Sequence, residues 1–145
     1  MSEIDHPNQT SNESWIEFFR RTKRFSDLIL LSWHLVEFDT DQLVARQYGL
    51  FYIDEKAVVI LKELTFDKRL TILRKSKAIS DEDYAVVHSF QQYRNRLFHG
   101  RDPFYYTMSD AEKEPIIDNA VEAVKILQAI GFGTRYSNST KESEK

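Results

Sequence analysis

Residues that end helices are rare in this chain, and their scarcity constrains the fold more than any other feature. The 145 residues include four glycines and three prolines. Because these two residue types mark most turns, a chain with so few of them favours long helices over a turn-rich β architecture. Apolar residues also recur at the three-and-four spacing of a helix face, as Trp15, Phe18, Phe25 and Ile29 do. We therefore predict an all-α fold.

Six helical segments are expected from these patterns. They cover residues 13–38, a short piece that ends near residue 48, and residues 55–63, 66–77, 81–98 and 110–130. Thr65, Ser80 and Ser109 precede three of the segments and can cap them, because their hydroxyls accept hydrogen bonds from unpaired N–H groups of the first turn. Gly100 and Gly131 end the last two segments. The pattern predicts an antiparallel bundle of four main helices plus short helices.

Two stretches in the first half of the chain interrupt the helical pattern. The polar run Asp39-Thr40-Asp41 is expected to break the first helix and to cap the short piece that follows. Residues 50–53 have strand propensity, but a single strand would have no partner, so we interpret them as a buried connector. Asp54 can then cap the helix over residues 55–63.

Both ends of the chain are polar and carry few side chains that could offset the entropy lost on ordering. We expect disorder over residues 1–12 and 134–145, and one helical domain over residues 13–133. The polar start has no signal-peptide pattern, and the longest apolar run, residues 28–31, is far shorter than the roughly 20 residues of a membrane span. We therefore expect a cytoplasmic protein with no membrane partner. The absence of cysteine excludes a thiolate nucleophile and a cysteine-based zinc site.

The charge distribution bears on nucleic acid as a partner. The formal net charge is −3, which argues against nucleic-acid binding. Basic residues nevertheless gather in three groups: Arg20, Arg21, Lys23 and Arg24; Lys68, Arg69, Arg74, Lys75 and Lys77; and Arg94, Arg96 and Arg101. Because RNA responds to the local field, these groups keep RNA binding open. For any one group, a solvated helix face is the simpler explanation.

The segment Tyr93-Arg94-Asn95-Arg96-Leu97-Phe98-His99-Gly100 is the strongest candidate for chemistry. It lies at the end of the helix expected over residues 81–98. On a helical wheel at about 100° per residue, Arg94 and His99 diverge by about 140°, so one straight helix places them poorly around a single phosphate. Fraying at Gly100, or pairing of two copies, would bring the two groups together. Asn95 and His99 are one turn apart and can touch.

The same wheel assigns faces to this helix. It places Val86, Phe90, Tyr93 and Leu97 on the face expected in the core, and His88, Gln92, Asn95 and His99 on the opposite face. His34, by contrast, falls among apolar neighbours on an earlier helix and is expected to be packed. No pair of histidines has the spacing or carboxylate neighbours of a zinc site, so no metal or other cofactor is expected.

The motif Arg94-Asn95-Arg96-Leu97-Phe98-His99 resembles the R-polar-x-x-x-H signature of the HEPN superfamily, small helical proteins many of which are metal-independent ribonucleases. The resemblance extends weakly over the helices from residue 14 to 131, and residues 65–100 carry its specific part. It implies a HEPN-like bundle that dimerises through the motif helices, with two motifs forming one composite site. Arg94, Asn95 and His99 would be catalytic, and Arg96 and Arg101 would contact RNA.

The resemblance also implies a mechanism and a biological setting. His99 would act as base toward a ribose 2′-hydroxyl or as acid toward the leaving 5′ oxygen, since an unperturbed histidine titrates at about pH 6.5. Arg94 would hold the phosphate, and Asn95 would orient His99 or a phosphate oxygen. A toxin–antitoxin pair or antiviral defence is the implied setting. Some family toxins pair with a nucleotidyltransferase antitoxin that modifies a tyrosine two residues after the histidine, where this chain has Arg101.

Simpler interpretations stand beside these expectations. Arg94 could pair with an acid of a neighbouring helix, and His99 could be a helix-end histidine favoured by the dipole. Residues 104–106 are three aromatics that could stack a base or pack under a loop. Some HEPN proteins keep the fold without activity, so the alternative function is a catalytically inactive module for dimerisation or protein docking.

Overall fold

A computed structural model describes residues 6–8, 13–49, 55–98 and 107–143. Within these ranges the chain forms helices and no strand. The helices are α1 (Trp15–Arg21), α2 (Phe25–Gln47), α3 (Glu55–Lys62), α4 (Phe66–Lys75), α5 (Asp81–Phe98) and α6 (Asp110–Ser143). The predicted all-α class is confirmed for this part of the chain.

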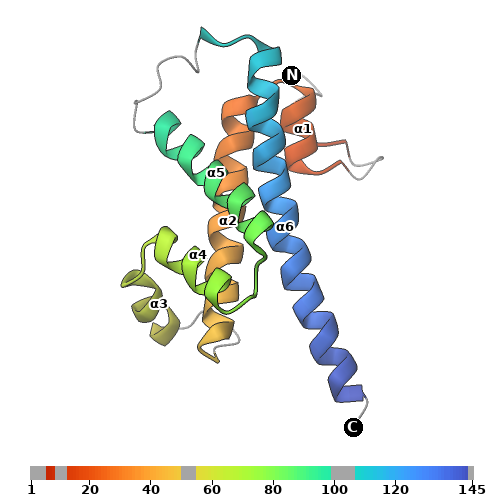
Figure 1. Cartoon of the computed structure of the whole chain (residues 1–145). Coiled ribbons are helices and arrows are strands. Elements are labelled where there is room, and N and C mark those ends of the chain that lie inside the picture. Colours follow the sequence, from red (N-terminus) through yellow and green to blue (C-terminus); the bar gives the residue numbers. More distant parts are fainter. Residues whose placement is uncertain (1–5, 9–12, 50–54, 99–106, 144–145) are drawn as a thin grey trace.

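Helix α2 is the centre of the molecule (Figure 1). It contacts α1, α3, α4, α5 and α6, and the long helix α6 runs along both α2 and α5. Trp33 of α2 joins three helices, because its ring lies 4.7 Å from that of Phe66 in α4 and 5.9 Å from that of Phe90 in α5, measured between centroids. The fully buried core around it includes Leu28, Val36, Leu70, Leu73, Val87 and Ile117.

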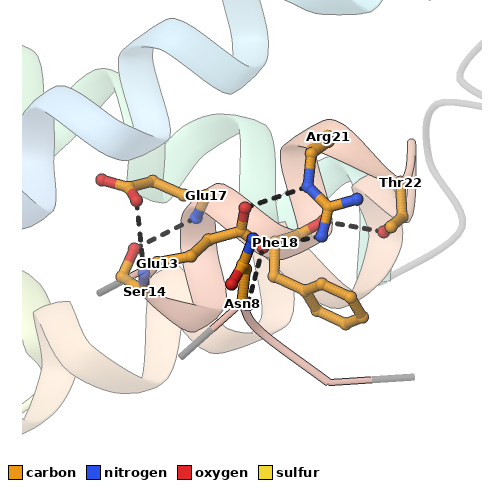
Figure 2. A network of polar contacts seen from close by, with 7 residues as sticks. All are labelled: Asn8, Glu13, Ser14, Glu17, Phe18, Arg21 and Thr22. Carbon is orange, nitrogen blue, oxygen red and sulfur yellow. Dashed lines mark hydrogen bonds and ion pairs between the residues drawn. The ribbon is translucent and has the colours of Figure 1, made fainter. Parts of the chain in front are cut away.

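Helix α1 begins with a capping box (Figure 2). The Ser14 hydroxyl accepts a hydrogen bond from the Glu17 backbone N–H at 3.1 Å, and the Glu17 carboxylate accepts one from the Ser14 N–H at 3.3 Å. Arg21 donates two hydrogen bonds to the Glu13 carboxylate, at 2.9 and 2.8 Å. The Glu13 N–H in turn donates to the Asn8 carbonyl at 3.0 Å. Disorder over residues 1–12 stays a prediction, since few of these residues are described.

The helix is interrupted between α1 and α2, so the prediction of one continuous helix over residues 13–38 is wrong. Lys23 has φ of 59°, the left-handed conformation that ends many helices. Its N–H donates to the Arg20 carbonyl at 3.2 Å, and the Arg24 N–H donates to the Phe19 carbonyl at 2.8 Å. These are the two bonds of a Schellman motif. Glycine usually occupies the left-handed position, so a lysine there gave no sign of the break.

The predicted break at residues 39–41 is also wrong, because α2 continues through them to Gln47. Thr40 is fully buried, and the Asp41 carboxylate accepts a hydrogen bond from Arg69 of α4. Burial raises the pKa of Asp41 above its ordinary value, and the hydrogen bond from Arg69 opposes that rise. The polar run is therefore held in the helix by contacts with other elements. The expected end near residue 48 is confirmed, with Gly49 at φ of 75°.

The caps predicted for the later helices are confirmed. The hydroxyls of Thr65, Ser80 and Ser109 each accept a hydrogen bond from a backbone N–H three residues later, at 3.3, 3.1 and 3.2 Å. Helix α4 ends at Lys75, two residues before the predicted end, and Lys77 then takes a left-handed conformation with φ of 61°. Residues 50–53, Asp54 and Gly100 lie outside the described residues. The buried connector, the helix cap and the helix end predicted there therefore stay predictions.

The predicted end of the last helix at Gly131 is wrong. Helix α6 includes Pro115 and continues through Gly131 and Gly133 to Ser143, so residues 134–143, predicted to belong to a disordered tail, are part of it. A glycine inside a helix costs about 1 kcal/mol relative to alanine but does not have to end it. Helix α6 is also tied to α1, because Arg20 donates hydrogen bonds to Glu114 at 2.6 Å and to Asp118 at 2.5 Å.

Candidate functional site

Arg94 lies just before the last turn of α5, on the side that faces α2. Val87, two turns earlier, and Phe90, one turn earlier, are both fully buried. The guanidinium carbon of Arg94 lies 4.8 Å from the centroid of the Trp33 ring. Trp33 is only 7% exposed, so the cation packs on a side chain of the core. A cation over the face of an indole is attracted by the ring's negative face, most strongly where water is excluded.

The face predicted for the core of α5 needs a correction at Val86. Phe90 is buried as predicted, but Val87 is fully buried while Val86 is only half-buried. Tyr93 and Leu97 are also half-buried, at the edge of the core. The inward face is therefore turned toward Val87, and Arg94 shares that face because it follows Val87 by seven residues. The structure thus places the motif arginine on the inward side of α5.

Asn95 contacts Arg94 directly. The Arg94 Nη1 donates a hydrogen bond to Asn95 Oδ1 at 3.2 Å, in a partly buried setting. The role predicted for Asn95 was to orient His99 or a phosphate oxygen. In the structure its carbonyl oxygen holds the arginine. Together with the Trp33 ring, this bond fixes the guanidinium from two sides.

An open groove of about 590 Å³ lies beside this pair. Its lining residues come from three helices: Phe19 of α1; Asp27, Leu30, Leu31, Trp33, His34 and Glu37 of α2; and Arg94 of α5. The walls are largely apolar, and the charged groups are two carboxylates and the Arg94 guanidinium. The Asp27 carboxylate accepts a hydrogen bond from Arg24 at 2.7 Å, which offsets its charge. One carboxylate, that of Glu37, and one cation, Arg94, then remain beside the apolar walls, so the groove can accept a ligand with an apolar part.

Two groove residues were not identified from the sequence as site residues. Trp33 was considered only as an apolar neighbour of His34, and His34 itself was predicted to be packed. That prediction is wrong, because His34 is exposed and lines the groove. Since Trp33 points into the core, its neighbour on the helix must point elsewhere. The signal in the sequence was a tryptophan directly before the histidine.

The remaining predicted site residues divide into described and undescribed ones. Arg96 is exposed on α5. Its described surroundings neither support nor oppose RNA binding. His99 and Arg101 lie outside the described residues, as do Gly100 and the aromatics at 104–106. The structure therefore brings Arg94 and Asn95 together and leaves the position of His99 untested. His88 is half-buried, and its ring stacks on Tyr84 at 5.6 Å between centroids.

The group of basic residues near the N-terminus is paired with carboxylates. Arg20 binds Glu114 and Asp118, Arg21 binds Glu13, and Lys23 lies 3.3 Å from Asp110. The hydrogen bonds to Asp118 and Glu114 raise the pKa of Arg20 further above its ordinary value. These pairs cancel most of the local electrostatic field, so a solvated helix face is the interpretation that fits this group.

The second basic group is only partly paired. Arg69 binds Asp41, and Arg74 binds Asp81. Lys68, Lys75 and Lys77 are exposed on and just after α4. This group therefore keeps a positive surface on α4.

None of the described helices combines the length and the apolar character that crossing a bilayer requires. Over the same residues there is no cluster of three or more histidine, aspartate or glutamate side chains suited to a metal ion. Comparison with protein-family models, curated proteins and solved structures found no match. The function is therefore inferred from the chain's own residues.

Proposed function

We propose that this chain is a metal-independent endoribonuclease of the HEPN type. The proposal includes a HEPN-like antiparallel bundle that dimerises through the motif helix α5, so that two motifs form one site. The observation that carries it is the state of Arg94: the motif arginine is held by Trp33 and Asn95 at the edge of an open groove. A fixed guanidinium can bind a phosphate without first losing side-chain entropy.

The proposed reaction needs no metal. His99 removes the proton of a ribose 2′-hydroxyl, and the 2′ oxygen attacks the adjacent phosphorus. Arg94 binds the phosphate and stabilises the charge that builds up on its oxygens. The bond from phosphorus to the 5′ oxygen breaks, and that oxygen takes up a proton. The products are a 2′,3′-cyclic phosphate and a 5′-hydroxyl. Arg96 and Arg101 contribute further phosphate contacts.

The setting we propose is a toxin–antitoxin pair or antiviral defence, with RNA as the target. A partner protein such as a nucleotidyltransferase antitoxin would restrain the activity. Arg101 stands where some family toxins have the modified tyrosine, so control would act at a different position.

The test is cleavage of a mixed RNA in excess EDTA by the wild type, His99→Ala and His88→Ala. His88→Ala is the matched control, because His88 lies on α5 and is stacked on Tyr84 rather than lining the groove. We expect the wild type and His88→Ala to cleave and His99→Ala to be at least 100-fold slower, about the low end of a general acid–base contribution. Equal cleavage by all three proteins would remove His99 from the mechanism.

A second substrate tests the chemistry itself. RNA with a 2′-deoxyribose at the scissile position lacks the proposed nucleophile, so it should resist cleavage completely. If it is cut as fast as ordinary RNA, attack by the 2′ oxygen is wrong.

The second candidate function is an inactive module that docks onto a protein. The observation that favours it is the exposed apolar surface of α2, where the side chains of Leu30 and Phe38 are each 55% exposed. Binding separates the two functions. The nuclease should hold uncleavable RNA with an affinity that falls with salt and with Arg94→Ala. The docking module should bind no RNA, either in the salt series or in the comparison with Arg94→Ala.

A further inference from the structure

The groove beside Arg94 contains a carboxylate that no described group neutralises. Glu37 of α2 lines the groove and is half-buried, and across the described ranges it takes part in no hydrogen bond or ion pair. One turn later lies Asp41, whose pKa is raised by burial and, to a smaller extent, by the charge of Glu37. Asp27, the second carboxylate of the groove, is bound by Arg24 at 2.7 Å. Glu37 therefore offers a ligand an acceptor whose hydrogen bonds are still to be made.

Apolar side chains accompany Glu37 on the groove side of α2. Leu30 and His34 precede it in the groove at a spacing of four and then three residues, which puts all three along one side of the helix. Leu30 is 55% exposed, and Phe19 of α1 adds a second apolar wall. The groove volume of about 590 Å³ falls within the range of about 300–1,000 Å³ found for small-ligand sites. A flat ring can therefore pack beside the carboxylate.

Arg94 brings a cation into the same groove from another helix. Its guanidinium lies over the ring of Trp33, which precedes Glu37 by one turn of α2. Both charged groups line the groove, yet they form no ion pair with each other. A ligand that satisfies both needs N–H donors for the carboxylate, an apolar ring for the walls and an anion for the guanidinium. A nucleotide has all three parts.

We propose that this groove binds a guanosine of the RNA strand, with Glu37 accepting hydrogen bonds from the guanine base and Arg94 binding the adjacent phosphate. The inference rests on the proposed ribonuclease function and deepens it by naming the base beside the cleaved phosphate. Guanine presents two neighbouring N–H donors, on N1 and on the N2 amino group, which match the two oxygens of one carboxylate.

The other three bases fit this carboxylate less well. Adenine and cytosine each present an amino group next to a ring nitrogen that accepts hydrogen bonds. Uracil presents one N–H between two carbonyl groups. In every case one oxygen of the Glu37 carboxylate would face another acceptor, which costs free energy instead of gaining a hydrogen bond. The chemistry of the groove therefore favours guanine.

The groove belongs to a single protomer. Its walls come from α1, α2 and α5 of one chain, so recognition of the base does not depend on how two copies pair. In the composite site that we propose, each copy carries its own groove. Of the motif residues, the inference uses Arg94 alone.

The test measures binding rather than cleavage. The probes are oligouridines that carry a 2′-O-methyl group on every ribose, so they cannot be cut, and one central guanosine or adenosine. We expect the wild type to bind the guanosine probe at least about 5-fold more tightly than the adenosine probe, the discrimination typical of a bidentate contact between a side chain and a base. An inosine probe lacks the N2 amino group and should lose most of this preference.

Two variants locate the source of the preference. Glu37→Gln removes the charge with little change in size, so it should bind the guanosine and adenosine probes nearly equally. Its affinity for the adenosine probe should equal or exceed that of the wild type, because a negative charge beside the strand is gone. Asp27→Asn is the matched control, since Asp27 lines the same groove but is bound by Arg24, and it should keep the wild-type preference.

Each other outcome overturns the assignment in a distinguishable way. Equal binding of the guanosine and adenosine probes by the wild type removes guanine recognition and leaves the nuclease to the cleavage assay in EDTA. A preference that survives in Glu37→Gln removes Glu37 as its source. Loss of affinity for both probes in Glu37→Gln, at an unchanged thermal unfolding temperature, shows a role that is not specific to the base. No binding of any probe overturns the guanosine site, and an absence of cleavage as well favours the docking function.

Discussion

Near each end of helix α5 an arginine packs on an aromatic ring, Arg74 of α4 on Tyr84 of α5 and Arg94 of α5 on Trp33 of α2, and the two pairs differ in their surroundings. Near the start of the helix, the Arg74 guanidinium lies 4.6 Å from the Tyr84 ring centroid. Near its end, the Arg94 guanidinium lies 4.8 Å from the Trp33 ring centroid. Arg74 has a side chain that is 47% exposed, and it also binds Asp81 at 2.8 Å. Arg94 lies against a ring that is almost completely buried.

The comparison shows that similar distances do not imply similar energies. Water screens the first pair, and its carboxylate partner already satisfies the charge, so each contact there adds little. The second pair has less water around it, which strengthens the attraction between the cation and the ring. The hydrogen bond to Asp81 raises the pKa of Arg74, but an arginine is charged at any physiological pH in either setting. The difference between the ends is therefore one of solvation.

The largest expected effect comes from Trp33→Ala. The indole contacts Phe66, Phe90 and Arg94, so its removal leaves a cavity where three helices meet. We expect the free energy of unfolding to fall by about 3–5 kcal/mol, measured by urea denaturation. Leu30→Ala, on the exposed side of the same helix, is the control and should cost less than about 0.5 kcal/mol. A loss of under 1 kcal/mol for Trp33→Ala would contradict the placement of this ring in the core.

Double-mutant cycles measure the comparison directly. One cycle pairs Arg94→Ala with Trp33→Leu, and the other pairs Arg74→Ala with Tyr84→Leu. We expect a coupling energy of about 2 kcal/mol for the first cycle, and about 0.5–1 kcal/mol for the second, because desolvation strengthens the cation–aromatic attraction. Equal values from the two cycles would show that the Arg94 pair is as well hydrated as the Arg74 pair.

The smallest expected effect is that of salt on the stability that Arg74 contributes near the start of α5. Arg74→Met keeps much of the side-chain volume and removes the charge, so it should lower the free energy of unfolding by at most about 1 kcal/mol at low salt. At 1 M NaCl the difference should disappear, because the Debye length is then about 3 Å. Arg94→Met serves as the comparison and should lose stability at both salt concentrations. A loss for Arg74→Met that persists at high salt would mean that its contacts are shielded from water.

Local features of the fold could be predicted from the sequence, because they depend on neighbours a few residues away. The hydroxyls of Thr65, Ser80 and Ser109 cap helices by bonding to an N–H three residues ahead, and sequence alone contains both partners. The breaks could not be predicted in the same way. Lys23 takes a left-handed conformation that lysine rarely adopts, and Asp41 stays helical with a partner from α4.

The site shows the same division. The motif at Arg94 and Asn95 was found from the spacing of residue types, but the hydrogen bond between these two side chains was not predicted. The rotation of α5 about its axis could not be predicted. Positions 86 and 87 are both valine, and only the packing against other helices decides which of the two is buried. His34 was missed for a related reason. Its apolar neighbours suggested burial, whereas the orientation of Trp33 decides on which side the histidine emerges.

The position of α6 has a consequence for synthesis on the ribosome. This helix covers α2 and α5, and Arg20 in α1 bonds to Glu114 and Asp118, about two thirds of the chain later. A domain that emerges from its N-terminus first cannot close such contacts until the late segment is made. The nascent chain therefore presents the apolar side of α2 to its surroundings for most of translation. A chaperone bound to that side would be released only when α6 arrives to replace it.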